Sequence, residues 1–280
     1  MAKCIAIVNQ KGGVGKTTTS VNLAASLAFY GQKILLLDLD PQANATSGLG
    51  FDKRSIEKTI YHVLSGSQTI LETIQKTAIQ NLDIIPSHID LIGAEIELIQ
   101  SIGREQILKT SLQQLASSYD FIFMDCPPSL GLLTLNALCA AQAVLIPIQC
   151  EYYAMEGLSQ LMDTIQRVQK ILNPQLQIEG VLMTMFDSRI KLSNDVVNEI
   201  RKVFGEKVYQ SLIVRNVRLA ESPSFGKPIF VYDFASRGSQ AYLQLAKEFM
   251  QRNGIVDTST NNSNLITESA STETVTVSQS

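Results

Sequence analysis

The 280-residue sequence lacks any long apolar segment. No run approaches the ~18–20 apolar residues needed to cross a bilayer. The chain enters an apolar stretch almost at once, with no basic region or cleavage signal before it. We therefore expect neither a membrane span nor a secretory signal. The composition, 45% hydrophobic and 18% charged, is that of an ordinary globular domain.

Paired cysteines are also missing. The four cysteines, Cys4, Cys126, Cys139 and Cys150, form no C-x-x-C motif, and each lies in an apolar run. Free, buried thiols in a reducing compartment are the favoured interpretation. An iron–sulfur cluster shared between subunits is the weaker alternative, because it would need cysteines paired from each subunit.

Basic residues are absent after Arg252. The remaining tail is rich in Ser, Thr and Asn, and its three acids equal the whole net charge of −3. These acids are Asp257, Glu268 and Glu273. Because such a tail has little to bury, we predict one ordered domain over residues 1–253 and a disordered acidic tail over residues 254–280.

Charge is unevenly distributed within the predicted domain. Residues 180–252 hold 11 Lys+Arg against 7 Asp+Glu, whereas residues 1–179 hold 12 against 16. A mildly basic final third suits contact with a polyanion and equally suits a solvated surface, so both alternatives stay open.

Apolar stretches alternate with amphipathic ones along the chain, which predicts strands separated by helices. The expected strands are 3–9, 33–40, 81–87, 120–128, 143–149, 178–186 and 209–214. The main expected helices are 15–31, 104–119, 132–141, 157–172, 195–205 and 239–252. This alternation implies an α/β fold with a doubly wound, mostly parallel sheet, helices on both faces, and a site beyond the carboxyl ends of the strands.

A glycine-rich turn joins the first expected strand to the first expected helix. Its residues are Lys11, Gly12, Gly13, Val14, Gly15, Lys16, Thr17 and Thr18. Glycines let backbone N–H groups approach phosphate oxygens, and the helix adds its positive end. We expect a P-loop in which Lys16 contacts the β- and γ-phosphates of a nucleotide and the Thr17 hydroxyl binds Mg²⁺. A chance glycine-rich turn is the less favoured alternative.

The loop departs from the usual pattern, G-x-x-x-x-G-K-[ST], because Gln10 stands where the first glycine belongs. It also contains a second lysine, Lys11. Lys16 and the backbone amides already serve the phosphates, so Lys11 has no necessary task within one subunit. We expect its target to be another subunit's nucleotide, as an arginine finger acts in trans. A solvated loop lysine is the alternative.

Three acids end two of the buried strands. Asp38 and Asp40 end the second strand on the same pleat face, and Asp125 ends the stretch FIFMD in the manner of a Walker B motif. Carboxylates at such positions can hold metal-bound water or orient an attacking water. An exposed acidic turn, or a buried strand that merely ends in aspartate, remains the alternative.

A polar segment, VRNVRLAESPSFGKP at 214–228, follows the last expected strand and should lie on the same rim as the P-loop. It contains Arg215, Arg218 and Lys227. Contact with base and ribose, binding of a polyanion, and a plain surface loop are all compatible with its composition.

Together these segments resemble the ParA/Soj family of partitioning ATPases, which belongs to the MinD-related group with the deviant Walker A motif K-G-G-x-G-K-[ST]. The similar segments, in order, are KGGVGKTT, DLDPQANATSGLG, DCPPSLGLLTLNAL, EYYAMEGLSQL and RNVRLAESPSFGKP. The match extends from residue 2 to about residue 252. It is nearest to the chromosomal Soj-type members, which lack an N-terminal DNA-binding extension.

The resemblance implies a switch with ATP and Mg²⁺ as cofactors, in which two subunits enclose two ATP molecules. It implies catalytic roles for Lys11, acting on the partner's nucleotide, for Lys16 in its own subunit, and for Asp40, which orients the hydrolytic water. Asp125 matches the Walker B acid, and with Asp38 it would hold the metal through water. Asn216 would contact the base, although Val214 stands where family members often have proline.

The resemblance further implies that the ATP-bound homodimer binds DNA without sequence preference. The candidate contacts are Arg215, Arg218, Lys227 and Arg189. A ParB/Spo0J-type centromere-binding protein would stimulate slow hydrolysis, in the cytoplasm and on the nucleoid. The sequence leaves open whether the cargo is a chromosome, a plasmid or another assembly.

Two other functions compete with this one. A MinD-like membrane-associated ATPase would need a basic amphipathic C-terminal helix, whereas the tail here is acidic. A non-catalytic nucleotide-binding scaffold would not need the full set of Lys16, Thr17, Asp40 and Asp125, so their presence favours hydrolysis.

Overall fold

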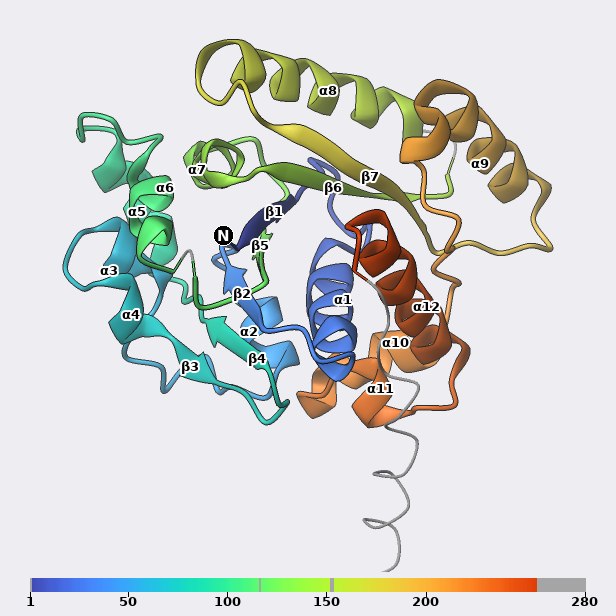
Figure 1. Ribbon diagram of the computed structural model, residues 1–280, viewed down its shortest axis with the longest axis horizontal. Coiled ribbons are helices and arrows are strands. Elements are labelled where there is room, and N and C mark those ends of the chain that lie inside the picture. The colour runs from blue at the N-terminus through green and yellow to red at the C-terminus, as the bar shows by residue number, and fades with distance from the viewer. Residues whose placement is uncertain (1, 116, 152–153, 256–280) are drawn as a thin grey trace, which may run out of the picture.

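The computed structural model describes residues 2–115, 117–151 and 154–255 (Figure 1). Within them the chain forms one seven-stranded sheet in the order β3-β4-β2-β5-β1-β6-β7. The strands are β1 (Lys3–Ile7), β2 (Ile34–Asp38), β3 (Gln75–Lys76), β4 (Leu82–Ile85), β5 (Phe121–Asp125), β6 (Ala143–Gln149) and β7 (Gln177–Thr184). All neighbours are parallel except the short edge strand β3, which is antiparallel to β4. The predicted doubly wound, mostly parallel sheet is confirmed.

Helices and short helical turns connect the strands. They are α1 (Lys16–Phe29), α2 (Asn44–Gly48), α3 (Ile60–Leu64), α4 (Ile70–Thr73), α5 (Leu91–Leu98), α6 (Ile107–Leu112), α7 (Leu132–Ala140), α8 (Ala154–Ile171), α9 (Lys191–Phe204), α10 (Val217–Glu221), α11 (Ile229–Tyr232) and α12 (Arg237–Arg252). The 3₁₀ segments are η1 (Gln113–Leu115), η2 (Gly205–Lys207) and η3 (Ser222–Phe225). No helix in these described parts is long and apolar enough to cross a membrane.

The sheet has a separate apolar core on each face. Side chains alternate along a strand. In β1, Ile5 and Ile7 therefore join the core under α1 and α12, while Cys4 and Ala6 join the core under α7 and α8. Figure 1 shows these helix pairs on opposite sides of the strands. Burial on both faces explains why the strands are apolar throughout.

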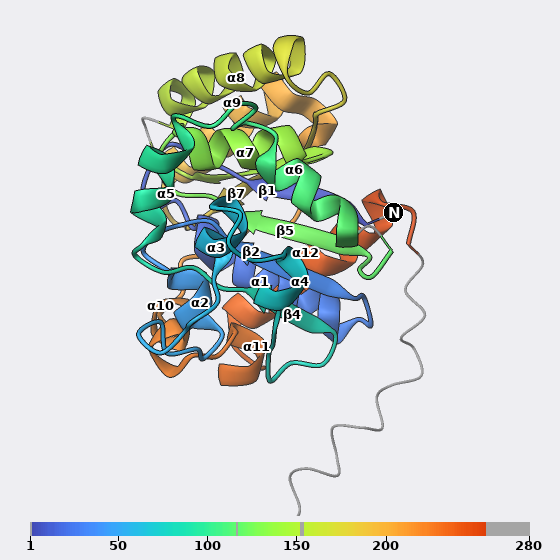
Figure 2. The same cartoon turned by 90° about the vertical axis from the view of Figure 1, so that its left-hand side faces the viewer.

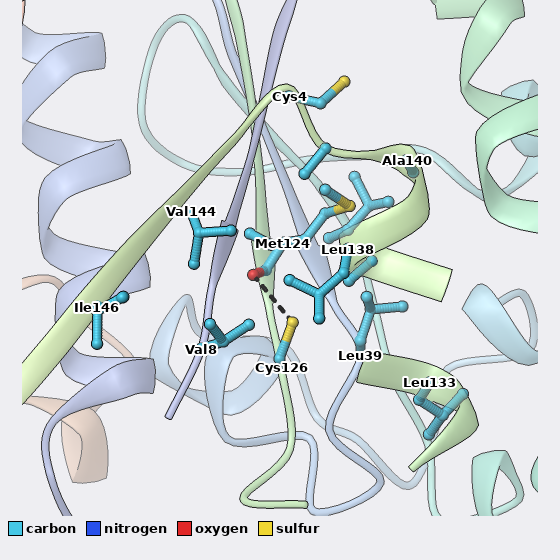
Figure 3. Close-up of a cluster of buried hydrophobic side chains, with 14 of the residues drawn as sticks. Cys4, Val8, Leu39, Met124, Cys126, Leu133, Leu138, Ala140, Val144 and Ile146 are labelled. Atoms are coloured by element: carbon cyan, nitrogen blue, oxygen red, sulfur yellow. Dashed lines mark hydrogen bonds between the residues drawn. The ribbon is translucent and has the colours of Figure 1, made fainter. Parts of the chain in front are cut away.

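The four cysteines lie buried and unbridged in these surroundings. Figure 3 shows Cys4 and Cys126 among aliphatic side chains, with the Cys126 thiol donating to the Met124 carbonyl at 3.7 Å. Burial raises the pKa of the Cys4 thiol to about 12 and raises that of Cys126 well above its usual value. Burial therefore disfavours the thiolate form of these two residues, and the prediction of packed, free cysteines is confirmed.

The strand expected at 209–214 is absent, so that prediction was wrong. Only Val208 and Val214, at either end, form isolated bridges beside β7. Between them the backbone N–H groups of Gln210 and Ser211 donate to the Glu248 carboxylate of α12, each at 2.8 Å. Because these donors are turned toward α12, a continuous ladder with β7 does not form.

A glycine in β7 makes room for the largest side chain in this region. A Cβ on Gly180 would lie 2.9 Å from Cδ2 of Tyr209 and 3.0 Å from the Lys207 carbonyl oxygen. The Tyr209 ring is fully buried, and the Arg252 guanidinium covers it at 4.0 Å. The Tyr209 ring therefore cannot move away from a methyl group added at Gly180 without displacing the Arg252 guanidinium.

We predict that Gly180→Ala lowers the free energy of unfolding by ~1–3 kcal/mol, the usual cost of overpacking. Urea denaturation would measure it. Gly93→Ala in α5 is the matched control, because its added methyl would meet only Glu97 Oε1 at 3.8 Å and alanine favours helix. Equal midpoints for the two variants would contradict the packing argument.

The strand order brings three connections to one edge of the sheet. β5 lies between β1 and β2, and Asp125 is in register with both Ile7 of β1 and Asp38 of β2. In Figure 2 the head of β5 points toward this edge. We call this side of the molecule, where the carboxyl ends of the parallel strands lie, the site edge. The P-loop follows β1, Asp38 and Asp125 end β2 and β5, and Asp40 follows β2.

Candidate functional site

The glycine-rich loop is held open by contacts from outside it. The Asn9 amide donates to the Pro147 carbonyl at 2.8 Å, and its Oδ1 accepts from the Lys11 N–H at 3.0 Å. The Thr184 hydroxyl at the end of β7 donates to the Val14 carbonyl at 2.8 Å. These contacts come from β6 and β7, so the neighbouring strands shape the loop.

Two glycines give the loop its curvature. Gly13 and Gly15 have φ values of 74° and 88°, a left-handed conformation that glycine adopts without strain. Gly15 also caps α1 without any side-chain hydrogen bond, and the first turn of α1 contains no acid. The N–H groups at the start of α1 are thus left to an anion, as phosphate-binding helices require.

Lys16 points into the loop. The residue is only 6% exposed, and its ammonium donates a hydrogen bond to the Lys11 carbonyl at 3.0 Å. Burial lowers the pKa of Lys16, while the charge of Asp125 opposes that change. A cation held inside the loop, next to free helix N–H groups, is placed to contact phosphate within its own subunit.

Lys11 lies in the opposite environment. Its side chain is 40% exposed, and its ammonium forms an ion pair with the Glu151 carboxylate at 2.9 Å. Glu151 is itself half exposed and follows β6. Surface pairs of this kind contribute only about 0–1 kcal/mol, so the Lys11 ammonium can exchange Glu151 for another anion at little cost.

Asp125 is a buried carboxylate with one oxygen left over. Oδ1 accepts from the Ser20 hydroxyl at 2.7 Å, whereas Oδ2 has no hydrogen-bond partner within the described residues. Burial, followed by the charge of Asp38, raises the pKa of Asp125 to about 7, and the hydrogen bond from Ser20 opposes this. A cation would stabilise the charged form.

A carboxylate and a hydroxyl are hard oxygen ligands of the type that Mg²⁺ takes, directly or through water. The unpartnered oxygen of Asp125 beside Thr17 therefore fits a magnesium ion. These are the two residues that would hold it here, and the ion would neutralise phosphate charge between them.

Asp38 and Asp40 differ, although the sequence places them on the same pleat face. Asp38 is fully buried: Oδ1 accepts from the Asp40 N–H at 3.1 Å, and Oδ2 accepts from the Thr46 N–H and hydroxyl at 2.8 and 2.7 Å. Burial raises its pKa to about 6. Asp38 thus ties the turn carrying Asp40 to α2. Its place in a metal site stays a prediction.

Asp40 lies on that turn and is largely buried. It is 8% exposed, and its Oδ1 accepts from the Gln42 N–H at 2.9 Å. Ala43, which begins α2, has a φ of 52°, a left-handed conformation that costs a non-glycine residue roughly 1 kcal/mol. The anchor at Asp38 stabilises this turn, and nothing in the local sequence signals it.

A cavity of about 250 Å³ adjoins the P-loop. Among its lining residues are Thr17, Thr18, Asn44, Ser222, Pro223 and Lys227, from α1, α2 and the 214–228 segment. The predicted closeness of that segment to the P-loop is thus borne out for Lys227. Ser222 and Pro223, which sequence reasoning missed, line the cavity because η3 folds back against α2.

Asn216 lies elsewhere. It caps α10, with its Oδ1 accepting from the Leu219 N–H at 3.2 Å, and it is not among the residues described as lining that cavity. Its predicted contact with the base therefore stays a prediction.

The turn after α2 touches the 214–228 segment through two glycines. A Cβ on Gly226 would lie 2.6 Å from the Gly50 Cα, and one on Gly50 would lie 3.1 Å from the Gly226 carbonyl oxygen. Side chains at either position would force the two segments apart. The connection that follows β2, which contains Asp40 and Gly50, is consequently in direct backbone contact with the segment that carries Lys227.

The four candidate DNA-binding residues are all exposed, but their surroundings differ. Arg189 forms a double hydrogen bond with Asp187, at 2.9 and 2.6 Å. Arg215 lies in the same neighbourhood, because its N–H donates to the Phe186 carbonyl at 3.1 Å. Arg218 pairs with Glu221 at 3.0 Å and with Asp233 at 3.4 Å. DNA contact by any of them stays a prediction.

In this mostly parallel sheet the inner strand β1 leads through the glycine loop to a helix N-terminus without a side-chain cap, and the adjacent strand β5 ends in the buried Asp125. This arrangement defines a P-loop nucleotide-binding protein. A family model described as an AAA domain matches residues 2–178. The chain is 57% identical over 248 residues to sporulation initiation inhibitor protein Soj of Bacillus subtilis, which covers 89% of this chain and 98% of that protein.

A second relative is chromosome partitioning protein ParA of Myxococcus xanthus, 54% identical over 252 residues, covering 90% of this chain and 89% of that protein. Among solved structures, cobyrinic acid a,c-diamide synthase from Mycobacterium smegmatis, with bound ADP and magnesium, matches with a TM-score of 0.80 and 37% identity. That match covers 91% of this chain and 96% of the other. The chain belongs to the ParA/Soj family of chromosome-partitioning ATPases, which confirms the predicted family, fold and enzyme class.

Proposed function

We propose that this chain is an ATP-dependent partitioning switch. It binds ATP with Mg²⁺, pairs with a second copy, hydrolyses ATP slowly, and binds DNA without sequence preference while paired. A ParB-type centromere-binding partner stimulates hydrolysis, and the protein works in the cytoplasm on the nucleoid. Supporting this are the relatives named for partitioning and the opposite environments of the two P-loop lysines.

The two lysines carry the proposal. Lys16 is buried within the loop and bonded to its backbone, so it serves the phosphates of its own subunit. Lys11 reaches outward to a weakly held carboxylate and is redundant for a nucleotide bound in the same loop. An exposed cation on the rim of one site is suited to the developing negative charge of another, as in trans-acting arginine fingers.

Different residues of the site edge then carry out different parts of ATP hydrolysis. Loop N–H groups and Lys16 hold the phosphates. Thr17 and Asp125 would hold the metal ion, which when bound would neutralise phosphate charge. Asp40 accepts a hydrogen bond from the attacking water and aligns it with the terminal phosphorus. Asp38, through its bond to the Asp40 N–H, holds this acid in place.

Dimerisation and DNA binding should both require ATP. We expect size-exclusion chromatography with light scattering to show dimers with a non-hydrolysable ATP analogue and monomers with ADP. Fluorescence anisotropy with unrelated DNA duplexes should show binding only under the first condition. Equal behaviour with ADP and with the ATP analogue would contradict the switch.

Arg218→Ala is expected to weaken ATP-dependent DNA binding and to leave dimerisation intact. Each lost phosphate contact should lower the slope of log affinity against log salt by about 0.9 per subunit. Anisotropy titrations over a salt series measure it. Lys76→Ala is the control: this exposed lysine also pairs with an acid, Asp83, but lies on the edge strand β3. An unchanged slope for Arg218→Ala would remove this residue from the interface.

The MinD-like alternative is not favoured. It would use a basic amphipathic helix to lie on the bilayer, and residues 253–280 contain no basic residue. The proposed acidic tail, 254–280, falls outside the described residues from residue 256 on. Strong ATP-dependent co-sedimentation with anionic liposomes would reverse this preference.

A further inference from the structure

A row of exposed isoleucines runs along α5 and the turns that flank it. The exposed fractions rise from 50% at Ile92 to 67% at Ile96, and Ile102 is fully exposed. The members of this row, named here the α5 ridge, are Ile89, Ile92, Ile96, Ile99 and Ile102. Spacings of three and four residues place the helical members on one face. The opposite face buries Leu91 and Leu98 in the core, so α5 is apolar on both sides.

The ridge belongs to the site edge. α5 follows the carboxyl end of β4, and Figure 2 shows it on the side toward which the head of β5 points. Glu95 lies against the turn after Asp125, since a Cβ on Gly131 would come within 2.6 Å of the Glu95 carboxylate. Just before α5, the Ser87 N–H donates to the Thr46 hydroxyl at 3.0 Å, the same hydroxyl that donates to Asp38.

Contiguous exposed isoleucines need a cover. Single exposed apolar residues are ordinary, but a continuous row on one element marks an interaction site. The α5 ridge lies at the same site edge as Lys11. Lys11 is redundant for a nucleotide bound in its own subunit, so its proposed role requires a second subunit. A stable interface buries about 1,200–2,000 Å² and has an apolar centre. Lys11 and its loop supply charge, while the ridge supplies the apolar area.

We propose that a second copy of this chain covers the α5 ridge in the ATP-bound dimer. The inference rests on the proposed function for the dimer itself and adds the surface that holds it together. A two-fold pair uses the same surface twice, so each subunit contributes its ridge to one interface. ATP bound in the two P-loops would bring the two site edges together. Apolar contact between the two α5 ridges would then hold the dimer.

The test is the double variant Ile92→Gln/Ile96→Gln. Both side chains are at least half exposed, so glutamine in a helix should preserve the fold, which circular dichroism and thermal unfolding would check. Ile171→Gln is the matched control: it is 74% exposed but lies at the far end of α8, away from the site edge. Sedimentation velocity with a non-hydrolysable ATP analogue gives the dimer dissociation constant, and a fluorescent ATP analogue gives nucleotide affinity.

We expect the double variant to weaken the dimer by about tenfold or more, with unchanged nucleotide affinity, and Ile171→Gln to match the wild type. A wild-type dimer constant in the double variant overturns the ridge proposal and leaves the switch standing, since the cover must then be another molecule. A wild-type protein that stays monomeric with the analogue overturns both.

Discussion

Lys11→Ala should abolish ATP-dependent dimers and reduce ATP hydrolysis by roughly 10³-fold or more, the scale on which a trans-acting cation contributes. Binding of ATP to the single subunit should survive. The reason is structural: Lys16, the loop N–H groups and the start of α1 hold the phosphates without Lys11, whose ammonium is paired outward with Glu151. Phosphate release, light scattering and a fluorescent ATP analogue measure the three properties separately.

Lys16→Ala is the informative contrast to that variant. Its ammonium lies inside the loop, so its loss should remove ATP binding first, and dimerisation and hydrolysis with it. If Lys11→Ala instead dimerises and hydrolyses like the wild type, Lys11 is a solvated loop lysine, and the trans assignment is wrong even though the family assignment stands.

Asp40→Ala should produce the opposite separation, with hydrolysis lowered by about 10²-fold or more and ATP-bound dimers retained. The carboxylate of Asp40 lies on a turn anchored by Asp38, at the site edge, and is largely buried. It is not needed to hold the phosphates. The trapped ATP dimer should accordingly stay on DNA longer than the wild type.

Asp52→Ala is the matched control, because Asp52 is an exposed acid in the same connection and likewise accepts a backbone N–H, from Arg54 at 3.0 Å. Single-turnover phosphate release and light scattering should show wild-type behaviour for it. Loss of dimers in Asp40→Ala would make Asp40 a structural residue of the turn, and normal hydrolysis would remove its catalytic assignment.

Local signals predicted the sheet well, and failed where a distant residue intervened. Six of the expected strands are present because an apolar run between two helices leaves few other conformations. The seventh, 209–214, also ends in an apolar run, yet Glu248 of α12 binds two of its N–H groups. Glu248 lies 37 residues from Ser211 along the chain, beyond any local pattern.

The short helices α2 to α5 and the edge strand β3 were likewise not predicted. α2 to α5 are only four to eight residues long, too short for a clear periodicity. In α5 the stretch LIGAEIEL is apolar on more than one side, so its pattern does not reveal which face is buried. Packing of Leu91 and Leu98 against the core decides it, and this leaves the α5 ridge outside.

The sequence by itself determined the chemistry of the site: a glycine loop with two lysines, a hydroxyl after the second, and acids at the ends of two apolar strands. These are contiguous motifs, and their meaning depends on spacing. Only the tertiary structure decided the different roles of the two lysines and of the aspartates. It buries Lys16 and leaves Lys11 on the surface. It gives both oxygens of Asp38 hydrogen bonds, whereas one oxygen of Asp125 has no partner among the residues that the structure describes. The physical reason is that burial and hydrogen bonding depend on strands, helices and turns far away in the chain.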